Sequence, residues 1–133
     1  MSLDIEAIMA NVAALGVNVR LSHQNQTIMH FICGLPMYIP VVEARKQEIV
    51  SLLKAVVKKR PDLWITDDDG MTCLHRAAQV RNSYAIQLID KCYDQLHPMQ
   101  DWSDYILLKS NRFYNARTYS IISGCPKTPI ILA

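Results

Sequence analysis

Histidine and cysteine occur in two close pairs, and these side chains could ligate zinc or form a nucleophile with its base. His30 precedes Cys33, and Cys73 precedes His75. A structural zinc site needs four correctly spaced ligands, and neither pair supplies them. Cys73 and His75 also fail as a nucleophile and its base, because neighbouring helix positions diverge and no orienting acid is indicated. We therefore predict no catalytic residue, no metal site and no cofactor.

The run Asp67-Asp68-Asp69 before Gly70 has the residue types of a calcium-binding loop. If Gly70 is the sixth residue of a loop of about twelve, Ile65 is the first and Arg76 the last, where a bidentate glutamate is required. The spacing excludes this kind of calcium site. We expect the first aspartate to organise a turn. The other two lie at its tip, where they are either solvated or in contact with a partner.

The bulk composition is that of a single folded domain. The chain has 133 residues, of which 50% are hydrophobic, enough to bury a core without disulfides. Its net charge of +2 arises from 14 basic and 12 acidic residues, so we do not expect nucleic-acid binding. The 4 cysteines form no Cys-x-x-Cys pair, which favours reduced thiols. No apolar run reaches the roughly 18 residues of a membrane span, and we expect a soluble, cytoplasmic protein.

Apolar residues recur at helical spacing along most of the chain. Thr72 begins one such run, where its hydroxyl can accept from free amides of the first turn, and Gly70 suits a turn with positive φ. Sheet is not needed. We predict an all-α fold with helices over residues 3–15, 27–34, 43–59, 72–80, 83–94 and from 128 onward, and a partly helical segment between 101 and 115.

One segment carries a specific motif. Residues 67–78 read Asp-Asp-Asp-Gly-Met-Thr-Cys-Leu-His-Arg-Ala-Ala. They resemble the ankyrin-repeat signature Asp-x-x-Gly-x-Thr-Pro-Leu-His-x-Ala-Ala, with Cys73 in place of proline. Residues 25–33 keep the threonine and the histidine as a weaker copy, and residues 126–133 read as a truncated copy. The motif positions are Thr27, His30, Gly70, Thr72, Leu74, His75, Ala77, Ala78 and Thr128.

The resemblance implies an ankyrin-repeat solenoid, and the motif spacing implies irregular insertions. Thr27, Thr72 and Thr128 lie 45 and 56 residues apart, against about 33 for an uninterrupted unit. The single domain, 1–133, then divides into a capping helix (1–21), a repeat with an insertion (22–66), a repeat with a long insertion (67–122) and the start of a further, truncated repeat (123–133). Because half a repeat cannot cover its own apolar face, we expect the natural chain to continue.

The resemblance further implies a concave face that binds a protein partner without catalysis. The face is formed by the first helix of each repeat and by the preceding loop, called a finger. Its expected exposed positions are Trp64, Thr66, Asp68, Met71, Arg76, Gln79 and Val80, with His23 and Gln24. Trp64 is either a packing residue or a binding anchor.

The long insertion, 95–119, is rich in the aromatic and arginine residues that are enriched in interface hot spots. Trp102, Tyr105, Ile106 and Leu108 recur at helical spacing, which favours packing onto the repeats. Arg112, Tyr114 and Arg117 are the candidates for exposure and partner contact.

A second hypothesis is that these residues are the ankyrin region of a larger protein with catalytic or targeting activity elsewhere. Repeats with large inserts resemble those of effectors that intracellular bacteria deliver into host cells, which would place the protein in the host cytosol. The sequence itself indicates neither a particular partner nor an oligomeric state.

Overall fold

The computed structural model describes residues 5–21, 24–35 and 43–123. Every regular element in these ranges is a helix, which confirms the all-α prediction for this part of the chain. None of the described helices is long and apolar enough to cross a membrane. The elements are α1 (Ile5–Leu15), α2 (Ile28–Cys33), α3 (Glu43–Val57), α4 (Cys73–Gln79), α5 (Ser83–Leu96), α6 (Trp102–Leu107) and α7 (Ala116–Ser123).

Capping side chains determine where three of the helices begin. The Thr72 hydroxyl accepts a first-turn N–H of α4 at 3.4 Å. Asn82 accepts a first-turn N–H of α5 at 3.1 Å, and Asn115 does the same for α7 at 2.9 Å. Each contact satisfies a backbone donor that has no acceptor within its own helix, so these polar residues fix the helix starts.

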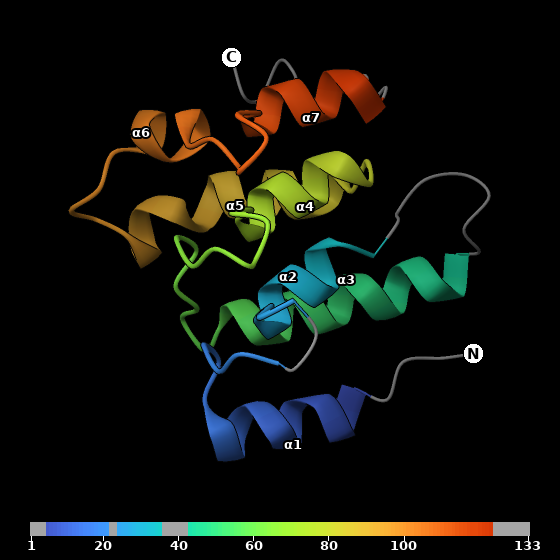
Figure 1. Ribbon diagram of the computed structural model, residues 1–133. Helices are drawn as coiled ribbons and strands as arrows, with labels where there is room; N and C mark the ends of the chain where they lie inside the picture. The colour runs from blue at the N-terminus through green and yellow to red at the C-terminus, as the bar shows by residue number, and fades with distance from the viewer. Residues whose placement is uncertain (1–4, 22–23, 36–42, 124–133) are drawn as a thin grey trace.

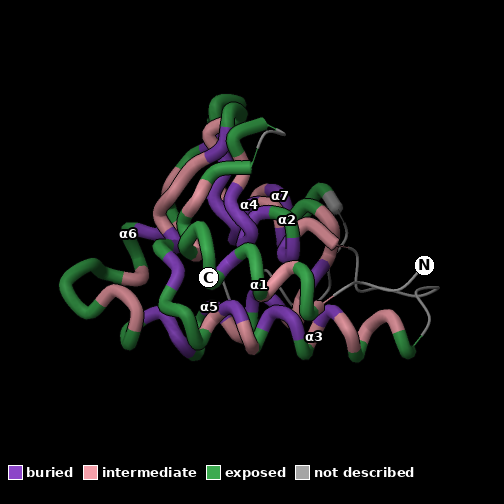
Figure 2. Tube along the Cα trace, turned by 90° about the horizontal axis from the view of Figure 1, so that it is seen from below, coloured by how far each residue is buried: buried purple, intermediate pink, exposed green. Residues whose placement is uncertain are grey.

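The helices form two layers (Figures 1 and 2). The short helices α2, α4 and α7 follow one another in one layer, with α4 packed against both of the others. In the second layer, α3 packs against α2 and α5 packs against α4, while α1 packs against α3 at one end. The short helix α6 packs against α7 at the other end. The result is a stack of helix pairs.

The core lies between the two layers. The large apolar side chains of α3 and α5 that face it are at most 1% exposed, and they are Ile49, Leu52, Leu53, Val56, Ile86 and Ile89. Burying one side chain of this size stabilises the fold by about 1.5–3 kcal/mol. In α4, Ala77 and Ala78 are fully buried. Their small size lets neighbouring helices approach α4 closely.

The helix α7 is the main departure from the sequence prediction. We expected a partly helical segment over 101–115, but α6 covers only Trp102–Leu107 and a further helix follows at Ala116–Ser123. The start of α7 lacks the threonine and the histidine of the motif, because Asn115 is its cap and Thr118 stands at the histidine position. Thr128, the predicted helix from 128 onward and the truncated repeat copy at 126–133 lie outside the described residues.

Candidate functional site

Three loops lead into the three short helices, and we call them finger 1 (24–27), finger 2 (66–72) and finger 3 (109–115). Each contains a residue with positive φ near its tip: Asn25 at 54°, Gly70 at 70° and Phe113 at 64°. In finger 2 the N–H of Asp67 donates to the carbonyl of Met71 at 3.0 Å, and finger 3 closes with the equivalent bond from Ser110 to Tyr114 at 2.9 Å. The two loops therefore share one backbone design.

The fingers are hydrogen-bonded to one another in a row. The Asp68 N–H donates to the carbonyl of Gln24 at 3.0 Å, and the Asn25 side chain donates to the Asp68 carboxylate at 2.8 Å. On the other side, the Asn111 N–H donates to the carbonyl of Asp69 at 2.9 Å and its side chain donates to that of Asp68 at 3.0 Å. Finger 2 is thus held from both sides, and the row forms a continuous polar edge.

His30 and His75 join each short helix to the following unit. Their Nε2 atoms donate to the carbonyls of Met71 and Leu108, both at 2.8 Å. Their Nδ1 atoms accept the backbone N–H of the capping threonines Thr27 and Thr72, at 3.1 and 2.9 Å. Each histidine therefore connects the cap of its own helix to the backbone of a segment that follows later in the chain.

Both imidazoles are neutral in this arrangement. Burial lowers the pKa of His30 and His75 below the usual value of 6.5 and outweighs the opposing effect of the carbonyls that accept from them. Protonation would also put a proton on the Nδ1 that accepts a backbone N–H. The two histidines are therefore structural residues.

Asp67 organises finger 2, as the sequence predicted. Its Oδ1 accepts the N–H groups of Asp69 and Met71 at 2.9 and 3.1 Å, and its Oδ2 accepts from Arg76 Nε and Nη2 at 2.8 and 2.6 Å. Burial pushes the pKa of Asp67 up, but the Arg76 guanidinium and the backbone donors outweigh it, and the pKa lies below 3.8. The pair anchors the finger to the first turn of α4.

Two adjoining hollows lie on the side of α4 that faces the fingers, and we call them together the groove. One, of about 370 Å³, lies between α2 and α4, and the other, of about 190 Å³, lies between α4 and finger 3. Arg76 and Gln79 line both hollows, Phe31 and Val80 line the first, and Asn111 and Arg112 line the second. The groove crosses three consecutive units of the stack.

The structure corrects several of the positions that we expected on this face. Met71 is buried, with 2% exposure, so it faces the core and not a partner. The Arg76 side chain is only 14% exposed and is bound by Asp67 and Asp69, so most of its donors are used within the protein. Thr66 is half-buried, and its carbonyl accepts from Arg20 at 2.7 Å.

Trp64 is a packing residue. Its indole N–H donates to the Tyr93 hydroxyl at 3.0 Å, and its ring lies 5.3 Å from that of Tyr105. Trp102 joins the same cluster, at 5.3 Å from Tyr93. This part of the long insertion packs onto the stack, as the helical spacing of Trp102 and Tyr105 predicted.

The remaining predicted positions are accessible to different degrees. Asp68 and Gln79 are exposed, and Val80 is half-buried. Arg112 and Arg117 are exposed, and Tyr114 is 39% exposed. The structure thus brings Asp68 and Arg112 onto the finger row and places Gln79 in the groove beside it.

Phe113 and Asn111 are functional candidates that the sequence reasoning missed. Phe113 is 80% exposed at the tip of finger 3, and its positive φ is a conformation that bulky residues rarely adopt. Asn111 links two fingers and lines the groove. The sequence feature that could have revealed finger 3 is Asn115, which lies 43 residues after Thr72 and, like Thr72, caps the start of a short helix.

Among the described residues, no group of three or more histidine, cysteine, aspartate or glutamate residues could hold a metal ion. Cys33, Cys73 and Cys92 are free and buried, and burial raises the pKa of Cys92 to about 11. The exposed polar and aromatic side chains of the fingers and the groove are suited to recognition.

Comparison with known proteins does not assign the chain to a family. No protein-family model matches the chain. No curated protein matches it.

Proposed function

We propose that this chain is an ankyrin-type repeat module that binds a protein partner through the finger row and the groove, without catalysis. The observation that carries the proposal is the hydrogen-bonded row of three fingers, each leading into one short helix of a single layer. A rigid row of exposed loop tips beside a groove presents side chains in fixed positions. Such preorganisation lowers the entropic cost of binding.

The units of the proposed solenoid are set by three capping residues. Thr27, Thr72 and Asn115 precede α2, α4 and α7 and are separated by 45 and 43 residues. This spacing is more regular than the one that we inferred from Thr128. In the proposed register, the third unit begins near residue 110, within the segment that we had assigned to a long insertion.

The chemistry of the surface favours a protein partner. Phe113, Tyr114 and Arg112 stand together on finger 3, and aromatic residues and arginine are the types that dominate binding energy at protein interfaces. Asp68 and Gln79 supply exposed polar groups next to them. A partner of this surface would place an apolar group against Phe113 and complementary polar groups along the row.

Affinity capture with two variants tests the proposal. Phe113→Gly combined with Arg112→Ala removes both anchors, and glycine suits the positive φ at position 113. Met99→Ala is the matched control, because Met99 is 93% exposed and lies between α5 and α6. Circular dichroism and thermal unfolding establish that both variants fold.

We expect the double variant to bind at least one partner of the unmodified protein about tenfold or more weakly, as for loss of an interface hot spot. The control should bind every partner normally. If the double variant retained every partner at full affinity, the assignment of this surface would be wrong.

A further inference from the structure

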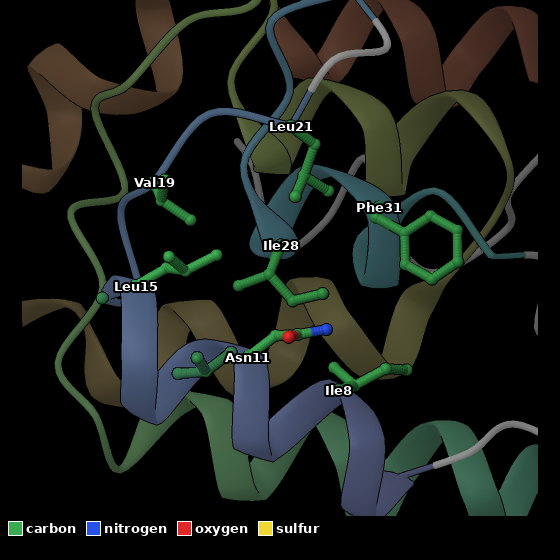
Figure 3. Close-up of a pocket in the computed structure, with 9 residues that line it drawn as sticks. Ile8, Asn11, Leu15, Val19, Leu21, Ile28 and Phe31 are labelled. Atoms are coloured by element: carbon green, nitrogen blue, oxygen red, sulfur yellow. The ribbon is translucent and has the colours of Figure 1, made fainter.

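One end of the stack carries an apolar hollow of about 380 Å³ (Figure 3). Ile8, Asn11 and Leu15 of α1 line it, with Ile28 and Phe31 of α2. The described part of the lining also includes Val19 and Leu21 of the connecting segment, and within it Asn11 is the one residue with a polar side chain. Leu15 is 64% exposed, Phe31 40% and Leu21 37%. Leaving this much apolar surface in water is unfavourable.

The arrangement of the helices indicates the shape that fills this hollow. Each of α2 and α4 packs against the long helix of its own unit and against the next short helix of the layer. The long helix α1 packs against α3, and no short helix is paired with it among the described residues. The hollow lies between α1 and the free side of α2, where the short-helix layer would continue. A short helix with an apolar face would fit there.

The opposite end of the stack presents such a helix. In α7, Ile121 is 58% exposed and Ile122 66% exposed. Counted from the capping residue, Ile121 holds the position that Ala78 holds in α4, and Ala78 is fully buried. Within the described residues α7 packs against α4 and α6 and has no long helix of its own. Among the described residues the two ends are therefore complementary, since no long helix packs against α7 as its pair and no short helix packs against α1 as its pair.

We propose that two copies of the chain associate head to tail, with α7 of one copy in the hollow between α1 and α2 of the next. The contact completes a helix pair from two molecules and covers Ile121 of one copy and Leu15 of the other. It continues the packing that joins α2 to α4 and α4 to α7 within one copy. Because the two surfaces differ, a dimer still has one free surface of each kind and can add further copies.

Lysine substitutions test the two surfaces separately. Leu15→Lys changes the hollow, and Ile121→Lys changes α7. Both positions lie in the last turn of a helix, where the helix dipole favours a cation, so neither change should disturb folding. Met99→Lys adds the same charge at an exposed apolar position outside both surfaces. Leu15→Gln and Ile121→Gln replace any lysine variant that fails a circular dichroism check.

Sedimentation analysis over a wide range of protein concentration gives the readout. We expect the unmodified chain and Met99→Lys to form dimers and larger species as concentration rises. Each single variant should associate at least about tenfold more weakly, because a lysine would have to be buried without a partner. An unmodified chain that stayed monomeric at every concentration would overturn the proposal.

Mixing the two variants distinguishes head-to-tail contact from a symmetric dimer. The Leu15→Lys chain keeps an intact α7, and the Ile121→Lys chain keeps an intact hollow, so the mixture should form one-to-one pairs and nothing larger. A symmetric dimer through one surface would leave one of the two variants associating normally by itself. That result, or a mixture without pairs, would show that the ends do not join in this way.

Discussion

Replacing Arg76 with methionine tests how finger 2 is held. The change removes the two hydrogen bonds, at 2.8 and 2.6 Å, that Asp67 Oδ2 accepts from the guanidinium. The Asp67 carboxylate has no exposed side-chain surface, so water cannot replace the lost donors without rearrangement. Breaking a buried ion pair by removing one partner costs about 3–5 kcal/mol. We expect about 3 kcal/mol, because Asp67 Oδ1 keeps its two backbone donors.

Urea unfolding followed by circular dichroism measures this loss, and the slope of the transition shows whether the variant remains two-state. Arg112→Met is the matched control, because Arg112 is an exposed arginine of finger 3, and it should change the free energy of unfolding by at most about 0.5 kcal/mol.

In a double-mutant cycle, Asp67→Asn with Arg76→Met should cost less than the sum of the single changes, since the two groups interact directly. A loss below about 1 kcal/mol for Arg76→Met would refute the reasoning. It would mean that Arg76 contributes little to holding finger 2.

Two further predictions concern buried histidines and a close backbone approach. Because the pKa values of His30 and His75 are lowered in the folded chain, the unfolded chain binds protons first as pH falls below 6.5. The free energy of unfolding should therefore be highest above pH 6.5, as far as these two histidines determine it, and should decrease as the pH falls below 6.5. Urea midpoints measured at several pH values test this. Midpoints that increased as the pH fell would instead indicate that the folded chain stabilises the imidazoles as cations. Gly70→Ala should destabilise the fold more than Gly16→Ala. Both glycines have positive φ, but a Cβ at Gly70 would also overlap the side chain of Asn111, whereas nothing lies within 4 Å of one at Gly16. If thermal unfolding showed equal losses of stability for the two variants, the side chain of Asn111 would not be in close contact with Gly70 of finger 2.

Much of the fold could be predicted from local sequence. The segment from Gly70 to His75 contains a turn glycine, a capping threonine and a histidine, each of which acts over a few residues, and the structure shows all three in these roles. The helices from α1 to α5 follow stripes of apolar residues at helical spacing, and their observed bounds differ from the predicted ones by a few residues at most.

The parts that were missed depend on contacts between distant segments. The start of α7 has an asparagine as its cap and a phenylalanine at the positive-φ position of the turn, so none of its residues matches the sequence motif. Only the backbone conformation of the turn resembles that of the other units. Met71 and Arg76 were expected on the surface because the resemblance to ankyrin repeats implies an exposed face formed by the finger and the first helix. The resemblance does not show that Met71 is buried, or that the carboxylate of Asp67, nine residues earlier, binds the Arg76 guanidinium.

Trp64 illustrates the same limit of local reasoning. A bulky aromatic residue before finger 2 was equally consistent with packing and with binding. Its partners Tyr93 and Tyr105 come from α5 and α6, and only the fold brings them together.

Site-specific photocrosslinking tests the central claim most directly. A photoreactive amino acid is placed at Gln79 in the groove, at Phe113 on finger 3, or at the exposed Gln87 of α5 in the opposite helical layer. If the finger row and the groove bind a protein, positions 79 and 113 should give a covalent adduct with the same partner, and position 87 should give none. An adduct from position 87 alone, or equal adducts from all three positions, would contradict the proposed surface.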